Sequence, residues 1–353
     1  MDESRAQAEI LSQLTSIDTL RDFRVKTAGT VTRNYFSILF PVFGENGQNL
    51  MVKIPKTDLR NRKEVGMFPL TDEDRRLGRA EFESLQLMSS HWDGSETGVN
   101  WVRPLGYLAD FNAIVTELVD AQEAWGQYHR RAFRHLLGSN RDGSALKDAM
   151  SRLGQSLGRF HSKASGAPVS IPATTMADRI DRYLGRLQTG GARIPSLESR
   201  NRGLGSLRKM QWLAPETTTF KGIDIRNILI AEPNAIWILD PGKIKRGPAE
   251  ADLARFLVTW RILFWGTPWF ALGLVPHLSL ESGFTNAYKK VSPINEQLLD
   301  AYLLKEILKH WHTAYETLSY KKMRRPFRTF LKAVYIDPFY RRQANVLLNR
   351  LAT

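Results

Sequence analysis

The fold of this chain is decided by one stretch, residues 220–247, which reads FKGIDIRNILIAEPNAIWILDPGKIKRG. Two short apolar runs flank a turn at residues 232–234, and this pattern predicts a β-hairpin. Such a hairpin brings Asn227 and Asp240 to the same end. Amide and carboxylate oxygens are ligands that Mg²⁺ accepts while it keeps positions open for phosphate oxygens. The stretch therefore predicts a magnesium site that serves nucleotide phosphate chemistry.

A lysine interrupts another apolar run. Residues 50–54, LMVKI, predict a strand with Lys53 in its middle, where an unpaired charge is costly. The sequence therefore predicts an acidic partner for Lys53.

A helix is predicted over residues 71–88. Glu81 falls on the apolar stripe of this helix, whereas Glu83 points elsewhere. We therefore expect Glu81 to face inward. The apolar residues that define the stripe are Leu77, Leu85 and Met88.

The order of these features resembles the protein-kinase-like phosphotransferases, in particular the branch of aminoglycoside, choline and lipopolysaccharide-sugar kinases. The resemblance covers about residues 20–260. It implies an α+β, two-lobe fold, with a small β-rich N-lobe that contains one helix, residues 1–118. The larger, mostly helical C-lobe, residues 119–353, is expected to contain the catalytic and metal loop, residues 220–242, and a basic aromatic C-terminal region.

The resemblance also implies roles in binding ATP and Mg²⁺. Lys53, held by Glu81, is expected to bind the α and β phosphates. Asn227 and Asp240 are expected to bind Mg²⁺. The adenine is expected to meet the backbone of Glu117 and Val119, at the end of a strand predicted over residues 113–119.

The phosphate-covering loop is poorly marked. It is expected at residues 26–34, between two predicted strands, and holds a single glycine. Thr30, Thr32 and Arg33 could meet phosphates there through hydroxyl, amide and guanidinium groups. A plain hairpin turn explains the segment equally well.

The catalytic carboxylate of the family is missing at its usual place. The family's loop reads His-Gly-Asp, four residues, then Asn, and counting back from Asn227 puts Gly222 at the Asp position. The nearest carboxylate is Asp224, which we expect to orient the acceptor hydroxyl, because phosphoryl transfer depends mainly on positioning and charge neutralisation. The other interpretation is a nucleotide-binding pseudokinase that regulates or scaffolds a membrane or nucleic-acid partner.

Two further polar residues receive structural interpretations. His161 adjoins the apolar stripe of a helix predicted over residues 146–165, and we interpret it as a packed residue without a catalytic role. Asp252 stands where relatives anchor the catalytic-loop backbone, and an ordinary helix-start carboxylate is the alternative.

Composition excludes several kinds of site. The 353 residues include no cysteine, which rules out disulfides, zinc-thiolate sites and cysteine nucleophiles. The seven histidines show no metal-ligand spacing. The first residues lack a basic start and an apolar core, so no signal peptide and a cytoplasmic location are expected.

The charge predicts an anionic partner. Lysine and arginine number 50 against 36 acidic residues, a net charge of +14, which disfavours a kinase of cationic antibiotics. Basic and aromatic residues interleave over residues 320–342, as at membrane surfaces or nucleic-acid sites. Residues 262–276 are uncharged and too short to span a bilayer. They either dip into the interface, with Trp265 and Trp269 at headgroup depth, or form a buried helix.

Together these features predict an ATP- and Mg²⁺-dependent phosphotransferase. Its acceptor is expected to be a hydroxyl of an anionic sugar, glycolipid or similar envelope molecule, such as a lipopolysaccharide sugar. Peripheral contact with the inner face of the cytoplasmic membrane is expected, and nucleic acid is the less favoured partner.

Overall fold

The computed structural model describes residues 3–34, 36–57, 66–92, 94–136, 144–220, 222–231, 235–267, 278–320 and 323–353. Packing divides the chain into two compact units, each described by itself. Unit 1 consists of Met1–Arg130, Phe220–Gly222 and Arg226–Ile244, and unit 2 consists of Arg131–Thr219, Ile223–Ile225 and Lys245–Thr353. The lobe boundary expected at residue 118 stays a prediction.

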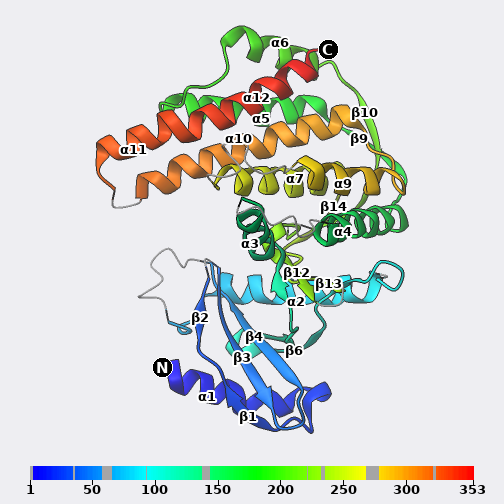
Figure 1. Cartoon of the computed structure of the whole chain (residues 1–353), viewed down its shortest axis with the longest axis vertical. Coiled ribbons are helices and arrows are strands. Elements are labelled where there is room, and N and C mark those ends of the chain that lie inside the picture. Colours follow the sequence, from blue (N-terminus) through cyan, green and yellow to red (C-terminus); the bar gives the residue numbers. More distant parts are fainter. Residues whose placement is uncertain are drawn as a thin grey trace. The chain divides into compact units, whose positions relative to one another are not determined.

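Unit 1 is built around a six-stranded antiparallel sheet, in which the order is β1-β3-β4-β7-β6 and β2 pairs with β3 (Figure 1). The strands are β1 (Val25–Ala28), β2 (Thr32–Arg33), β3 (Ser37–Gly44), β4 (Asn49–Pro55), β6 (Pro104–Leu108) and β7 (Ala113–Glu117). Strand β4 contains the predicted run 50–54 and lies at the centre of the sheet, so Lys53 projects from its middle.

The core of unit 1 follows the two-residue period of its strands. Ile38, Phe40 and Val42 of β3 are buried, and the alternate residues Leu50, Val52 and Ile54 of β4 join them. Helix α1 (Glu3–Gln13) adds Ala6 and Ile10 to the same core. Lys53 therefore belongs to the other face of β4.

Helix α2 (Asp72–His91) confirms the predicted helix, and Glu81, Leu85 and Met88 lie on its buried face. The expectation for Leu77 is wrong, because its side chain is 37 % exposed. At that turn Gly78 faces inward instead, so close to Asn112 that an added Cβ would lie 1.9 Å from the Asn112 amide oxygen.

A second sheet in unit 1 contains the predicted hairpin. Its order is β5-β13-β12-β8, and β12 pairs antiparallel with β13, with Ile228 opposite Ile238. The strands are β5 (Val99–Trp101), β8 (Gln122–Glu123), β12 (Ile228–Ala231) and β13 (Ala235–Ile238). The turn at residues 232–234 lies outside the described residues.

Unit 2 is mostly helical. Helix α10 packs against α5, α7 and α12, and α4 packs against α9. The main helices are α4 (Ser144–Lys163), α5 (Ala173–Thr189), α6 (Leu197–Leu207), α7 (Glu250–Trp265), α9 (Leu278–Lys289), α10 (Glu296–Tyr320), α11 (Arg325–Leu331) and α12 (Asp337–Leu351). A π-helical turn, η5 (Lys332–Ile336), joins α11 to α12.

One further helix, α3, and several short strands and turns complete the described chain. Strand β10 pairs antiparallel with β9, and β11 pairs with β14. These elements are η1 (Leu14–Ser16), η2 (Asp18–Leu20), η3 (Ala109–Phe111), α3 (Ala124–Leu136), β9 (Pro168–Ile171), β10 (Trp212–Pro215), β11 (Thr217–Phe220), η4 (Ile225–Asn227) and β14 (Ile244–Gly247). None of the helices in the described part of the chain is both long enough and apolar enough to cross a bilayer.

Candidate functional site

Lys53 is held between two carboxylates, all three within unit 1. Its Nζ forms an ion pair with Oε1 of Glu81 and lies 2.9 Å from Oδ2 of Asp240. The structure thus brings together three residues that the sequence assigned to nucleotide and metal binding. One cation faces two carboxylates, so the set carries a surplus negative charge when all three are ionised.

The charges of this set shift the pKa values of all three members. Burial lowers the pKa of Lys53, but the charges of Asp240 and Glu81 outweigh burial and raise it above its ordinary value. Burial and the neighbouring Asp240 charge raise the pKa of Glu81 to about 7, although Lys53 opposes this. Asp240 keeps a lowered pKa, because Lys53 and a backbone hydrogen bond from Gly242 outweigh burial.

A separate buried ion pair positions the helix that carries Glu81. Lys56 Nζ lies 3.1 Å from Asp74 Oδ2, and both side chains are buried. Asp74 also accepts hydrogen bonds from the backbone of Thr57 and of Thr71, which is the N-cap of α2. Burial raises the pKa of Asp74, but these bonds lower it to about 2. The pair fastens α2 to the end of β4, and sequence reasoning missed it.

The backbone after Asp240 turns so that one carboxylate oxygen is fixed. Gly242 donates its N–H to Asp240 Oδ1 at 2.7 Å. Gly242 has φ of +58°, a left-handed conformation that glycine adopts at little cost. The glycine of the Asp-x-Gly sequence is therefore explained by backbone geometry, and Oδ2 is left to face Lys53.

Gly222, at the position of the family's catalytic Asp, packs directly under this segment. Its N–H donates to the Pro241 carbonyl at 2.8 Å. A Cβ at position 222 would lie 1.6 Å from the backbone oxygen of Asp240. No side chain fits at this position with the observed backbone, so the missing carboxylate is a requirement of packing here.

Asn227 is oriented by the same loop. Its Nδ2 donates to the Gly222 carbonyl at 2.8 Å. Because the amide nitrogen is used in this bond, the amide oxygen is the group left for a cation.

The residues fit a magnesium ion that draws most of its ligands from elsewhere. Within the described ranges, no three acidic or histidine side chains gather into a metal cluster. An ion held by Asp240 and Asn227 would therefore take further oxygens from phosphates and water, which is how Mg²⁺ commonly binds with nucleotides.

Asp224 belongs to unit 2 rather than to unit 1. Its side chain is buried, and its charge acts on His310 of α10. Burial lowers the pKa of His310 to about 4, with Lys309 and Arg255 acting in the same direction and Glu306 and Asp224 opposing. The predicted role of Asp224 toward an acceptor stays a prediction.

The segment expected to contact adenine lies at the end of β7. Leu118 donates its N–H to the Asn49 carbonyl at 2.9 Å, and Glu117 donates to the Arg103 carbonyl at 3.1 Å. Among the described residues, the backbone of Val119 has no backbone hydrogen bond. Its N–H and C=O therefore remain available to a ligand.

The expected phosphate-covering segment is more ordered than a loop. Strands β1 and β2 occupy much of residues 26–34. Arg33 forms an ion pair with Glu3, and the Thr32 hydroxyl donates to the Leu39 carbonyl. Gly29 packs on Pro41, where an added Cβ would lie 2.6 Å from Cγ. These contacts favour the plain hairpin interpretation.

His161 and Asp252 contact each other inside unit 2. His161 Nε2 lies 3.3 Å from Asp252 Oδ2, and Nδ1 lies 2.9 Å from the Tyr288 hydroxyl. All of this is buried, as expected for a packed histidine.

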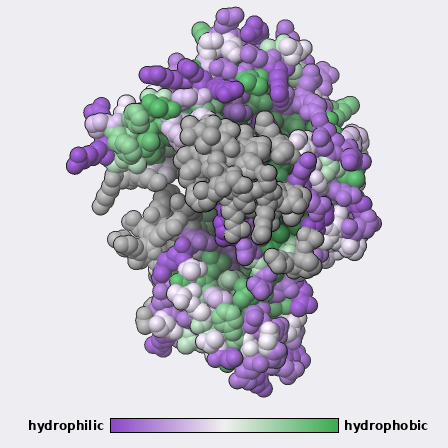
Figure 2. Space-filling model, viewed as in Figure 1, coloured by the Kyte–Doolittle hydropathy of each residue, from purple (hydrophilic) through white to green (hydrophobic). Residues whose placement is uncertain are grey.

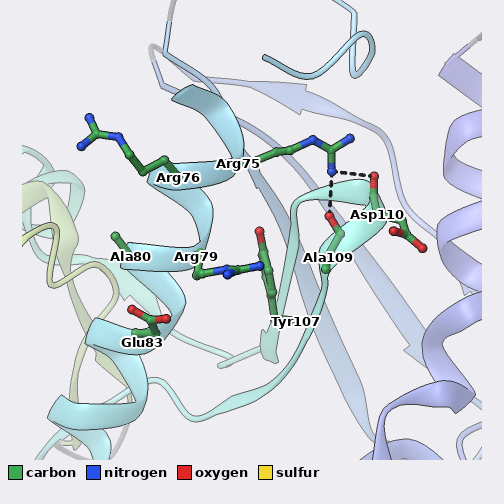
Figure 3. Close-up of a pocket in the computed structure, with 8 residues that line it drawn as sticks. All are labelled: Arg75, Arg76, Arg79, Ala80, Glu83, Tyr107, Ala109 and Asp110. Atoms are coloured by element: carbon green, nitrogen blue, oxygen red, sulfur yellow. Dashed lines mark hydrogen bonds between the residues drawn. The ribbon is translucent and has the colours of Figure 1, made fainter. Parts of the chain in front are cut away.

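A cavity of about 480 Å³ lies between α2 and the facing segment of β6 and η3 (Figure 3), and its lining does not include the Lys53 set. Arg75, Arg79 and Tyr107 line it, and Arg75 donates to the Ala109 carbonyl at 3.0 Å. Glu83 lines this cavity, while Glu81, two residues earlier, faces Lys53. The Lys53 set and this cavity are therefore separate features of unit 1.

Comparison with known proteins identifies the fold. No family model and no curated protein matches the sequence. Solved structures do match. An amicoumacin kinase, hAmiN, solved with AMP-PNP, Ca²⁺ and its antibiotic, is 12 % identical over 96 % of each chain, with a TM-score of 0.53. The macrolide 2'-phosphotransferase MphH from Brachybacterium faecium is 12 % identical over 92 % of this chain and 98 % of that chain, with a TM-score of 0.53.

A choline/ethanolamine kinase family protein from Mesorhizobium loti is 14 % identical over 98 % of this chain and 99 % of that chain, with a TM-score of 0.50. At these identities the likeness establishes the fold. The chain has the α+β, protein-kinase-like fold of the aminoglycoside phosphotransferase and choline kinase branch, which confirms the predicted fold class.

Proposed function

We propose that this chain is an ATP- and Mg²⁺-dependent phosphotransferase that acts on an alcohol group of a small molecule. The observation that carries the proposal is the ammonium of Lys53 between Glu81 and Asp240. Solved proteins of the same fold are small-molecule kinases, and one of them was determined with an ATP analogue. A set with surplus negative charge gains from a bound cation, which a purely structural ion pair would not require.

Each residue has a defined part in this proposal. The ammonium of Lys53 contacts the α and β phosphates in place of Asp240. Glu81 keeps the Lys53 side chain oriented. Asp240 and the amide oxygen of Asn227 hold Mg²⁺, which neutralises charge on the phosphates when bound. The carbonyl of Glu117 and the N–H of Val119 hydrogen-bond adenine.

The acceptor is an anionic sugar, glycolipid or similar envelope molecule, such as a lipopolysaccharide sugar, and Asp224 orients its hydroxyl. The net charge of +14 supports an anionic acceptor. The protein would meet such an acceptor at the cytoplasmic face of a membrane.

One observation favours a second function, a pseudokinase that binds nucleotide and regulates or scaffolds a partner. Gly222 excludes a carboxylate from the family's catalytic position, because its neighbour is the Asp240 backbone. A chain that lacks the catalytic Asp at this position could still bind nucleotide without transferring phosphate.

ATP binding with and without Mg²⁺, followed by thermal shift alongside ADP release, tests both functions. Nucleotide at about 100 times its Kd should stabilise the protein by about 2.7 kcal/mol. Asp240→Asn should lose the Mg²⁺-dependent part, and Asp224→Asn should lose turnover while keeping nucleotide affinity. Asp178→Asn, which removes an exposed ion pair with Arg208 in unit 2, is the matched control.

The outcomes separate the two functions. Magnesium-dependent stabilisation with ADP release that Asp224→Asn abolishes supports the enzyme. Binding without release, across a panel of sugar and lipid acceptors, favours the pseudokinase. Absence of any ATP binding overturns both.

A further inference from the structure

Helix α11 in unit 2 exposes large apolar side chains. None of the residues in α11 or in the turn η5 is buried. Phe327 is 52 % exposed, and Phe330 and Val334 are each 57 % exposed. Other strongly exposed apolar residues, such as Leu197 and Leu213, lie in separate elements. Three such residues within eight positions form a local concentration that an isolated surface leucine does not.

The three side chains share one side of the helical segment. Phe327 and Phe330 are three residues apart, and Val334 follows four residues later, which is the spacing of one helix face. Figure 2 shows green, hydrophobic residues next to purple, hydrophilic ones in the region that α11 occupies in Figure 1. Within the described chain, α11 packs extensively only on η5, which continues it.

Exposed basic side chains precede this apolar face in the chain and follow it on α12. Arg324 and Arg325, at the start of α11, are exposed, and Arg341 and Arg342 are exposed on α12. The structure shows no ion pair for Arg324 or Arg325 among the residues it describes. Lys321 and Lys322, which belong to the same basic run, lie outside those residues. Arginine next to exposed phenylalanine is the composition of helices that lie in an anionic lipid interface.

The segment that follows α11, from the end of η5 to the start of α12, is held by buried contacts. Asp337, at the start of α12, is buried and accepts hydrogen bonds from Trp311 Nε1 at 3.1 Å and from the Tyr315 hydroxyl at 2.6 Å. Trp265 stacks on Tyr335 and Phe339, and its Nε1 donates to the Tyr335 carbonyl at 3.0 Å. Trp265 therefore packs within unit 2. The sequence had left open a position at headgroup depth for Trp265 and Trp269, and Trp269 lies outside the described residues.

We propose that α11 and η5 form a membrane-docking surface that lies in the interface of a bilayer containing anionic phospholipid. Phe327, Phe330 and Val334 enter the acyl boundary, and Arg324 and Arg325 contact lipid phosphates. The inference deepens the proposed function, because it names the surface that would bring the protein to a membrane-borne acceptor. It rests on the exposure of α11 and not on the nucleotide site.

Charge complementarity decides between this partner and a second copy of the chain. A symmetric contact through α11 would bring two positively charged segments together, because residues 324–336 contain no acidic residue, and this costs free energy without intervening anions. Anionic lipid offers negative charge and an apolar layer together. A nucleic acid would match the arginines but would give no apolar environment to Phe327 and Val334.

Co-sedimentation with vesicles, in the absence of nucleotide, tests the proposal. The full chain is mixed with vesicles of phosphatidylcholine alone or of phosphatidylcholine and phosphatidylglycerol in equal parts. The variants are Phe327→Ser with Phe330→Ser, and Arg324→Gln with Arg325→Gln. The matched control is Leu197→Ser with Leu213→Ser, which removes exposed apolar surface elsewhere. Because all these side chains are exposed, thermal unfolding should be nearly unchanged.

The wild type should bind the anionic vesicles and not the neutral ones. The phenylalanine variant should lose affinity by about tenfold or more, and the arginine variant should bind more weakly and depend less on salt. The control should bind like the wild type. The proposal is overturned by equal binding of the phenylalanine variant, by equal loss in the control, or by no wild-type binding.

Two other results would also overturn it: a wild-type dimer that the phenylalanine variant makes monomeric without vesicles, or salt-sensitive binding to a duplex oligonucleotide that vesicles do not displace. A failure of ATP binding leaves the vesicle result standing, and a failure of vesicle binding leaves the kinase proposal standing.

Discussion

Two helical glutamates, Glu81 in unit 1 and Glu306 in unit 2, are buried to nearly the same degree, yet the pKa values of their carboxyl groups shift in opposite directions. Burial and the charge of Asp240 raise the pKa of Glu81 to about 7. Burial also raises the pKa of Glu306, but Lys305 and Lys309 outweigh it and lower the pKa to about 2. Both glutamates pair with lysine, so the pairing alone does not explain the contrast.

The number of cations per carboxylate explains it. Glu81 shares the single ammonium of Lys53 with Asp240, whereas Glu306 has Lys305 and Lys309 within 3.0 Å each. The surplus positive charge near Glu306 is relieved by water, because the Lys309 side chain is 37 % exposed. A shared cation leaves a buried set that gains from another positive charge, and we interpret the Lys53 set as binding machinery and the Glu306 set as structure.

The largest effect is expected for Asp240→Asn, because Glu81 then no longer shares the ammonium of Lys53 with a second carboxylate. Turnover should fall by about three orders of magnitude or more, because the variant loses a magnesium ligand and its charge. At the same time the pKa of Glu81 should fall, since the Asp240 charge that raises it is gone. Steady-state ADP release measures the first effect, with Asp178→Asn as control. Wild-type turnover in the Asn variant would show that Asp240 is not a ligand.

Changing each glutamate to glutamine contrasts the two sets directly. Glu306→Gln should lower the free energy of unfolding by about 3 kcal/mol, because Lys305, whose side chain is largely buried, loses its carboxylate partner. Glu81→Gln should cost about 1 kcal/mol or less, because the raised pKa already favours the neutral carboxyl. Urea denaturation measures both. ATP affinity should fall only in Glu81→Gln, and the reverse pattern would contradict our assignment.

A third prediction concerns Gly222, which packs against the backbone of Asp240. Gly222→Ala should lower the free energy of unfolding by about 2 kcal/mol, because the new Cβ meets the Asp240 carbonyl. Gly185→Ala is the control. Position 185 lies in α5 with nothing within 4 Å of an added Cβ, so alanine there should stabilise the protein by about 0.5–1 kcal/mol. Two equal melting temperatures would show that the loop moves freely.

The smallest effect concerns pH. The pKa of Glu81 is raised from 4.5 to about 7 in the folded protein. Between these values the folded state binds more protons than the unfolded state, so the free energy of unfolding should fall as pH rises through this range. Glu81→Gln should remove this slope, and Glu306→Gln should not. Melting temperatures across the range measure it, and a flat wild-type profile would contradict the raised pKa.

Sequence reasoning succeeded where one element decides the matter. The period of apolar residues in α2 placed Glu81 inward, and the apolar run of β4 placed Lys53 where it needs a partner. It failed at Leu77, because a contact between Gly78 and Asn112 shifts the buried stripe at that turn. It also missed the ion pair of Lys56 with Asp74, although Asp74 lies seven residues before Glu81 on the same buried face of α2.

Local sequence patterns predicted the strand with Lys53, the helix with Glu81 and the hairpin that follows Asn227, because each depends on contacts between residues near in the chain. The contact between Asp240 and the ammonium of Lys53, 187 positions apart, depends on tertiary packing. Tertiary packing also decided that Gly222 lies under the Asp240 carbonyl. Such contacts join distant segments, and their distances follow from packing of the whole unit rather than from any local pattern.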